Sequence, residues 1–211
     1  MKYLYLFFAF FMLTSCSKEE GYGPFHLKDG QEVELLVDHR YGSVDDTPLL
    51  LPQNESPQLP LSGFEEREAG YTYRVKAKMV AYKGAQVMDG GPMSHLKFIE
   101  VISKEKHEGN EPFDLSLVWS VIPGPNRVWL MKEEGKYMYI LRDGSRMQLT
   151  YADEKVGGKL EEIWEFNKEI FRYDSSPSEK GSKWQSIRAT VTHDPDNFGK
   201  AYLVSHIELT E

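Results

Sequence analysis

Between Tyr71 and Met79, apolar side chains occupy every second position, and polar or basic side chains occupy the positions between them. A period of two places these two sets on opposite faces of a β-strand. The sequence therefore predicts an extended strand with one buried face and one exposed face. The exposed face would carry three cations, which are Arg74, Lys76 and Lys78.

Further segments with strand-like composition predict a mainly β fold with two small sheet-like or barrel-like domains. The first domain is expected over residues 31–105 and the second over residues 106–211, with a boundary in the Gly- and Pro-containing segment 108–112. Expected strands of the first domain are 31–38, 71–79 and 96–103, and the proline-rich segment 41–61 leaves room only for short edge pieces. Expected strands of the second domain are 114–122, 128–132, 137–142, 145–151, 184–192 and 201–209.

Two local signals refine the second domain. Asp143-Gly144 separates two alternating runs and predicts a hairpin turn in which both residues take positive φ. Apolar and polar residues at helical spacing between Leu160 and Asn167 predict a short helix over residues 158–168. A three-strand meander, a helix and two further strands form the element order of an OB-like barrel, which we expect for this domain.

The N-terminus has the pattern of a signal peptide. Lys2 precedes an apolar run from Tyr3 to Leu13, which is too short to span a bilayer as a stable helix. The run ends in Leu13-Thr14-Ser15-Cys16, which resembles the bacterial lipobox. We therefore expect residues 1–15 to be removed as a lipoprotein signal peptide and the thiol of Cys16 to carry lipid. An ordinary signal peptide followed by an incidental cysteine is the alternative.

Lipidation would make the membrane the first partner of this chain. The two or three acyl chains of a mature lipoprotein anchor a protein durably, because each buried methylene contributes about 0.8 kcal/mol. Residues 16–30, with three glycines and a proline, are expected to form a flexible tether. Ser17-Lys18-Glu19-Glu20 resembles the acidic export signal of some Gram-negative lipoproteins that reach the cell surface. We expect anchoring in the outer membrane, with either periplasmic or surface exposure.

One pattern in the first half of the chain comprises Leu61-Ser62-Gly63-Phe64, Gly70-Tyr71-Thr72-Tyr73-Arg74-Val75-Lys76-Ala77 and the closing segment 96–104. Through this pattern, the stretch from about residue 32 to residue 104 resembles the domain of unknown function 4377 family of envelope lipoproteins. The resemblance covers about a third of the chain and implies an envelope lipoprotein with a β fold. Many family members carry a cysteine pair in the segment that matches 37–51, and this chain has none there. The resemblance implies no catalytic residues, and the C-terminal half stays unassigned.

Composition and motifs favour a protein without catalytic activity. Cys16 is the single cysteine, so the folded body can contain no disulfide, no cysteine-ligated metal and no thiol nucleophile. The formal net charge is −8, and neither half of the chain is basic, which argues against nucleic-acid partners. No G-x-S-x-G, H-E-x-x-H or phosphate-loop motif occurs. We expect no cofactor and no metal, and we keep an envelope hydrolase only as a minor alternative.

Three features leave room for a binding role with a protein or glycan partner. Arg74, Lys76 and Lys78 would form either a solvated strand face or a docking strip for a partner. Buried aromatic side chains dominate β-barrel cores, so each of the four tryptophans is expected in the core, with Trp129 the most exposed. Surface tryptophans would instead favour a glycan-binding accessory protein. The segment 193–199 is expected to be a connecting turn rather than a calcium loop, because Phe198 stands where a ligand would be needed.

Overall fold

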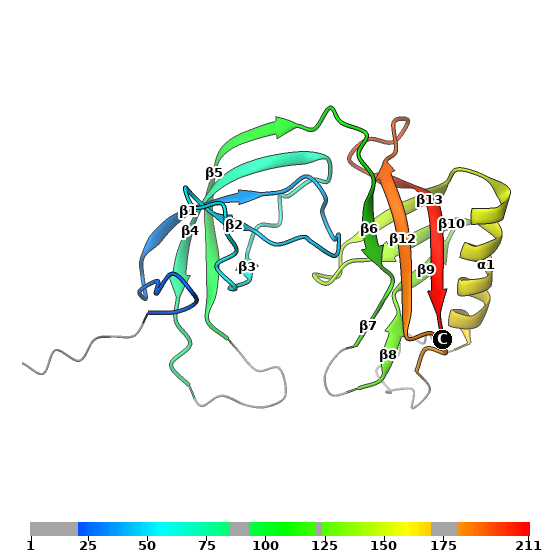
Figure 1. The fold of residues 1–211 in the computed structure, drawn as a ribbon, viewed down its shortest axis with the longest axis horizontal. Helices are drawn as coiled ribbons and strands as arrows, with labels where there is room; N and C mark the ends of the chain where they lie inside the picture. Colours follow the sequence, from blue (N-terminus) through cyan, green and yellow to red (C-terminus); the bar gives the residue numbers. More distant parts are fainter. Residues whose placement is uncertain (1–20, 85–92, 121–123, 170–180) are drawn as a thin grey trace, which may run out of the picture.

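The computed structural model describes residues 21–84, 93–120, 124–169 and 181–211. The fold is mainly β, as expected, and forms two lobes that lie at the left and right of Figure 1. In the part of the chain that the structure describes, no helix is long and apolar enough to cross a membrane. The lipobox residues Leu13, Thr14, Ser15 and Cys16 lie outside the described residues.

The first lobe contains a five-stranded sheet in the order β2-β1-β4-β5-β3. Its strands are β1 (Glu32–Val37), β2 (Leu49–Leu50), β3 (Leu61–Ser62), β4 (Tyr71–Val80) and β5 (His95–Lys106). The expected short edge pieces of the proline-rich segment are β2 and β3, which occupy the two edges. β5 extends three residues beyond the predicted end of its strand, to Lys106.

The alternation of apolar and polar residues in β4 gives the predicted buried and exposed faces. Tyr73, Val75, Ala77 and Met79 are almost completely buried, because they face a core that also holds Leu35 of β1. β1 and β4 are antiparallel, with Leu35 opposite Val75. The side chains between the buried ones are exposed or half-buried and form the opposite, charged face of the sheet.

The second lobe contains a six-stranded sheet in the order β6-β12-β13-β11-β10-β9. Its strands are β6 (Phe113–Ser116), β9 (Leu130–Glu133), β10 (Lys136–Ile140), β11 (Arg146–Tyr151), β12 (Ser186–His193) and β13 (Ala201–Thr210). The meander, the helix and the last two strands follow the expected order, with β11 parallel to β13. β6 pairs with β12 and β9 lies at the other edge, so the described strands form an open curved sheet.

The strand predicted over 114–122 is interrupted. β6 ends at Ser116, and β7 (Val118–Ser120) pairs with β8 (Asn126–Val128) in a separate two-stranded ribbon. Leu117 joins the two pieces, because its N–H donates to the carbonyl of Ile187 and its carbonyl accepts from the N–H of Trp129. This break directs Trp119 away from the main core.

The single helix, α1 (Glu154–Lys168), begins four residues before the predicted start. Asp153 caps it by accepting a hydrogen bond from the N–H of Val156 at 2.9 Å. The sequence did not predict this first turn, because Gly157 and Gly158 lie at its end and glycine has a low helix propensity. The helix packs Leu160 and Ile163 onto the second sheet, on the side away from the first lobe (Figure 1).

The predicted hairpin between β10 and β11 is confirmed, but its turn is not the expected two-residue type. The strands are joined by the five-residue segment 141–145, in which Gly144 has φ +84° and Asp143 does not take positive φ. The turn with two consecutive positive φ values is Glu134-Gly135, between β9 and β10. Asp143 instead accepts hydrogen bonds from the N–H and hydroxyl of Ser145, which stabilise the longer loop.

Candidate functional site

A cleft of about 900 Å³ lies between the two lobes. We call it the inter-lobe cleft. Its first-lobe wall includes Tyr41, Ser43, Phe64 and Arg67, and its second-lobe wall includes Trp119 and Arg142. This volume lies within the range of small-molecule binding sites, which combine aromatic surface with a few directed polar groups.

The segment after β1 crosses to the second lobe and forms part of the cleft wall. The N–H of Val44 donates to the carbonyl of Asp114 at 2.9 Å, and the Tyr202 hydroxyl donates to the carbonyl of Tyr41 at 2.8 Å. Burial and a hydrogen bond to the Asp143 carboxylate raise the pKa of Tyr41 to about 12, so its hydroxyl stays protonated. These bonds fix the segment after β1, and with it this part of the cleft wall, to the second lobe.

A buried ion pair supports this wall. Arg67 and Asp46 have side chains that are only 12% and 13% exposed, and Nη2 of Arg67 lies 2.6 Å from Oδ1 of Asp46. The same nitrogen donates to the carbonyl of Asp38 at 2.9 Å, and the guanidinium lies 4.4 Å from the ring centroid of Tyr41. A guanidinium with this many contacts is fixed in position before any ligand arrives.

Unpartnered polar atoms are concentrated at this cleft. In the described ranges, four buried side-chain nitrogen or oxygen atoms have no hydrogen-bond partner, and three belong to cleft residues: Oγ of Ser43, Nε of Arg67 and Nε1 of Trp119. Each of the three can donate a hydrogen bond. Buried polar groups are nearly always paired, so a group of unpaired donors at one cleft calls for an explanation.

A second hollow of about 750 Å³ continues from the cleft and shares Trp119, Leu141 and Arg142 with it. Trp119 and Trp129 stack face to face, with ring centroids 3.7 Å apart and ring planes 6° from parallel. The Arg142 side chain is exposed at the junction of the two hollows, and no ion pair or hydrogen bond joins it to the described residues. Aromatic faces and an unpaired cation are therefore presented side by side.

No known family, curated protein or solved structure matches this chain. The resemblance of residues 32–104 to the domain of unknown function 4377 family consequently stays a prediction.

The four tryptophans differ from the expectation in one respect. Trp184 is buried, with 2% of its surface exposed, while Trp119, Trp129 and Trp164 are all half-buried. Trp129 is therefore not the single partly exposed tryptophan, because Trp119, which stacks on it, and Trp164 are also half-buried. The break at Leu117 moves Trp119 off the alternating core face, an effect that the sequence pattern did not reveal.

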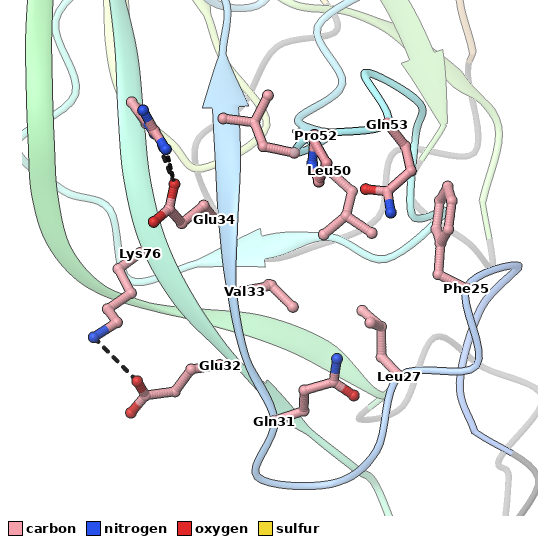
Figure 2. Close-up of a pocket in the computed structure, with 12 residues that line it drawn as sticks. Phe25, Leu27, Gln31, Glu32, Val33, Glu34, Leu50, Pro52, Gln53 and Lys76 are labelled. Atoms are coloured by element: carbon pink, nitrogen blue, oxygen red, sulfur yellow. Dashed lines mark hydrogen bonds and ion pairs between the residues drawn. The ribbon is translucent and has the colours of Figure 1, made fainter.

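The cationic face of β4 is the second candidate. It borders a hollow of about 560 Å³, shown in Figure 2, in which Val33, Leu27 and Phe25 lie on the other side of β1 from Glu32. Lys76 Nζ lies 3.1 Å from the Glu32 carboxylate, and Arg74 Nε donates to Glu34 at 2.7 Å. Lys78 is exposed and lies opposite Glu32 in the strand register. Of the three predicted binding residues on β4, Arg74 and Lys76 thus form ion pairs with carboxylates of β1.

A cluster of three histidines, which sequence reasoning missed, joins the two lobes without lining the cleft. His39 follows β1, His107 follows β5 and His193 ends β12. Nδ1 of His39 and Nε2 of His193 are hydrogen-bonded at 2.8 Å, and the rings of His39 and His107 stack with centroids 3.5 Å apart. The residues are separated by up to 154 positions, so no linear motif could have identified them.

The segment 193–199 forms the expected turn. Asp194 accepts hydrogen bonds from the N–H groups of Asp196 and Asn197 and from the Thr150 hydroxyl. Burial alone would raise the pKa of Asp194, but these hydrogen bonds lower it overall. Across the described residues, no group of three or more histidine, aspartate or glutamate side chains has the arrangement of a metal site.

Proposed function

We propose that this chain is a non-catalytic, lipid-anchored protein of the bacterial cell envelope that acts by binding a ligand in the inter-lobe cleft. The observation that carries the binding role is the group of unpartnered donors on Ser43, Arg67 and Trp119. These atoms are themselves buried, so a ligand with oxygen acceptors would pair with them only after cleft side chains shift, and each new hydrogen bond would then offset a cost of about 1–3 kcal/mol.

Binding rather than catalysis is supported by the partners of the reactive side chains. A hydrolytic site needs a nucleophile within hydrogen-bond reach of a base. Among the described residues, the hydrogen bonds and ion pairs of His39, His107 and His193 go to one another and to carboxylates, and no serine or threonine hydroxyl bonds to them. Within the cleft wall, the Asp46 carboxylate is already engaged by Arg67.

The anchor is proposed from Leu13-Thr14-Ser15-Cys16, and the outer membrane of a Gram-negative cell is its proposed location, with either periplasmic or, through Ser17-Lys18-Glu19-Glu20, surface exposure. Metabolic labelling with a palmitate analogue tests the anchor. The parent is expected to carry label and to partition with membranes, whereas a Cys16→Ala variant is expected to lose both properties. Label retained by the variant would contradict lipidation at Cys16.

A glycan is the proposed ligand class, because Trp119, stacked on Trp129, lines both hollows together with the unpaired Arg142. Flat aromatic faces pack against the apolar faces of sugar rings, while hydroxyl oxygens accept hydrogen bonds from exposed donors such as the guanidinium of Arg142. The two connected hollows suit a short linear oligosaccharide rather than a single sugar.

Glycan arrays probed with purified protein test this ligand class. A Trp119→Leu variant is expected to lose roughly tenfold in affinity for any glycan bound by the parent, which corresponds to about 1.4 kcal/mol. Trp164→Leu is the matched control, because Trp164 is also half-buried but lies on α1, away from the cleft. Equal losses in the two variants, or no bound glycan at all, would contradict the proposal.

A further inference from the structure

The histidine cluster lies where the lobes meet and is tightly packed. His193 is 9% exposed, and the side chains of His39 and His107 are 12% and 22% exposed. Phe113 and Tyr202 enclose His193, with ring centroids 5.5 Å away in each case. A titratable group in such a position is coupled to the packing of both lobes.

The hydrogen bond between His39 and His193 depends on protonation. One ring nitrogen must donate and the other must accept, so at least one of the two rings has to be neutral at that atom. The other ring nitrogen of His193, Nδ1, is buried without a hydrogen-bond partner, so no acceptor stabilises a proton on it. When both rings are protonated, two N–H groups face each other at 2.8 Å and the bond is lost.

The charged groups around the cluster do not neutralise that second proton. Asp38 lies 3.7 Å from Nε2 of His39 and is already hydrogen-bonded to Arg40, and Glu111 lies 3.2 Å from Nε2 of His107. Lys106, at the Phe198 ring beside His193, adds a positive charge. Asp194, next in the chain, is engaged by Thr150 and Asn197. Asp38 and Glu111 thus lie nearest His39 and His107, and burial and the two neighbouring rings lower the pKa of His193 more than Asp38 raises it.

We propose that the hydrogen-bonded pair of His39 and His193, with His107 stacked on His39, forms a proton-operated latch, which holds the two lobes together around the inter-lobe cleft at neutral pH and releases them on acidification. The release follows from repulsion between protonated rings across the lobe boundary and from loss of the bond between His39 and His193. The proposal rests on the proposed function in one respect, since it describes the regulation of the same ligand site. Opening the cleft would release a bound glycan.

The electrostatics of the cluster agree with this geometry. Burial is the largest cause that lowers the pKa of His193, to about 4, and the neighbouring His39 and His107 lower it further. The pKa of His39 is also lowered by burial, against the opposing effect of Asp38. Both rings therefore stay neutral at pH 7, and acidification is the direction in which the latch opens.

Pulsed electron–electron spin resonance between one label on each lobe tests the latch. Cys16 is the single natural cysteine, and in the full-length protein it would be occupied by lipid, so cysteines introduced as Lys97→Cys and Lys155→Cys can be labelled selectively. Lys97 is exposed on β5 and Lys155 is exposed on α1. The full-length protein in detergent is expected to show one inter-label distance at pH 7.5 and a second, longer population that grows as the pH approaches 4.

Two substitutions identify the groups responsible. His193→Gln retains a side chain that can donate and accept but cannot titrate in this range, and is expected to lose the pH-dependent population. His206→Gln, at an exposed histidine of β13, is the matched control and is expected to behave like the parent. The titration of the parent alone remains decisive if His193→Gln does not fold.

The outcomes separate this proposal from the proposed function. A distance distribution that is unchanged down to pH 4, while circular dichroism shows the fold intact, overturns the latch even if glycans bind at pH 7.5. A distribution that opens with acid supports the latch even if no glycan binds, and in that case only the ligand proposal fails. Opening that persists unchanged in His193→Gln also overturns the assignment to this cluster.

Discussion

Two regions of the molecule place an arginine beside a carboxylate, but in opposite environments. One is the charged face of β1 and β4, which carries Arg74 and Glu34, and the other is the inter-lobe cleft, which holds Arg67 and Asp46. On the β1–β4 face, Arg74 pairs with Glu34 in an exposed position, with side chains 50% and 41% exposed. In the cleft, Arg67 pairs with Asp46, with side chains 12% and 13% exposed, and Nε of Arg67 has no hydrogen-bond partner among the described residues. The first ion pair is exposed to solvent. The second is buried in the wall of a cleft and leaves one arginine N–H without an acceptor.

This difference teaches how to distinguish a solvated face from a binding site. A row of cations in the sequence, such as the one on β4, is conspicuous, but two of its three members, Arg74 and Lys76, pair with carboxylates of the neighbouring strand. The cleft has no such row, and its distinguishing property is the shortage of hydrogen-bond partners for buried atoms. Unsatisfied polarity, rather than net charge, therefore marks the candidate site.

The largest expected effect is on stability, and it tests directly whether the two ion pairs differ in burial. Arg67→Met should lower the free energy of unfolding by about 3–5 kcal/mol, because it leaves the Asp46 carboxylate buried without its counter-ion. Arg74→Met is the matched control and should cost about 0–1 kcal/mol, as exposed ion pairs do. Guanidinium unfolding followed by tryptophan fluorescence measures both. Equal costs would show that the cleft ion pair is no more buried in solution than the pair on β4.

The second prediction concerns pH and separates the histidine cluster from the surface. The pKa of His193 is about 4 in the folded protein against an ordinary value of 6.5, so between these values the unfolded state binds more protons. The free energy of unfolding should therefore fall as the pH drops from 6.5 to 4, by about 3 kcal/mol in total, and should be flat above pH 7. Carboxylates with a lowered pKa, such as Asp38, lose their contribution only at lower pH.

Chemical denaturation at half-unit pH intervals measures this slope. His193→Gln should flatten most of it, whereas His206→Gln should leave it unchanged because His206 is exposed. A parent protein equally stable at pH 7 and pH 4.5 would contradict the burial of a neutral His193.

The sequence predicted most of the secondary structure, because period-two alternation is a local property. β4, the three-strand meander and the last two strands all follow from residues within each segment. The failures have local causes as well. Gly157 and Gly158 concealed the first turn of α1, and the positive-φ turn lies at Glu134-Gly135 rather than at Asp143-Gly144.

The candidate site was far less predictable. Its residues come from the segment after β1, from the loop before β4, and from β7 and the β10–β11 loop, and only the tertiary fold brings them together. Trp119 was expected in the core, since its alternation with Leu115 and Leu117 does not reveal the strand break. His39 and His193 had no signal at all, because isolated histidines are compatible with any exposed or buried position.

The smallest expected effect tests the packing between the lobes at Gly70, which directly precedes β4 and faces Phe198. Gly70 has φ +81°, and a Cβ atom there would lie 2.5 Å from the ring of Phe198 in the second lobe. Gly135 has φ +80° with no atom within 4 Å of such a Cβ, so Gly135→Ala isolates the backbone cost of about 1–2 kcal/mol. Gly70→Ala should cost about 1–2 kcal/mol more, because the Phe198 ring is held between Tyr71, His193 and Lys106 and has to shift. Thermal unfolding of the two variants measures the difference, and identical melting temperatures would mean that the lobes do not pack at Phe198 in solution.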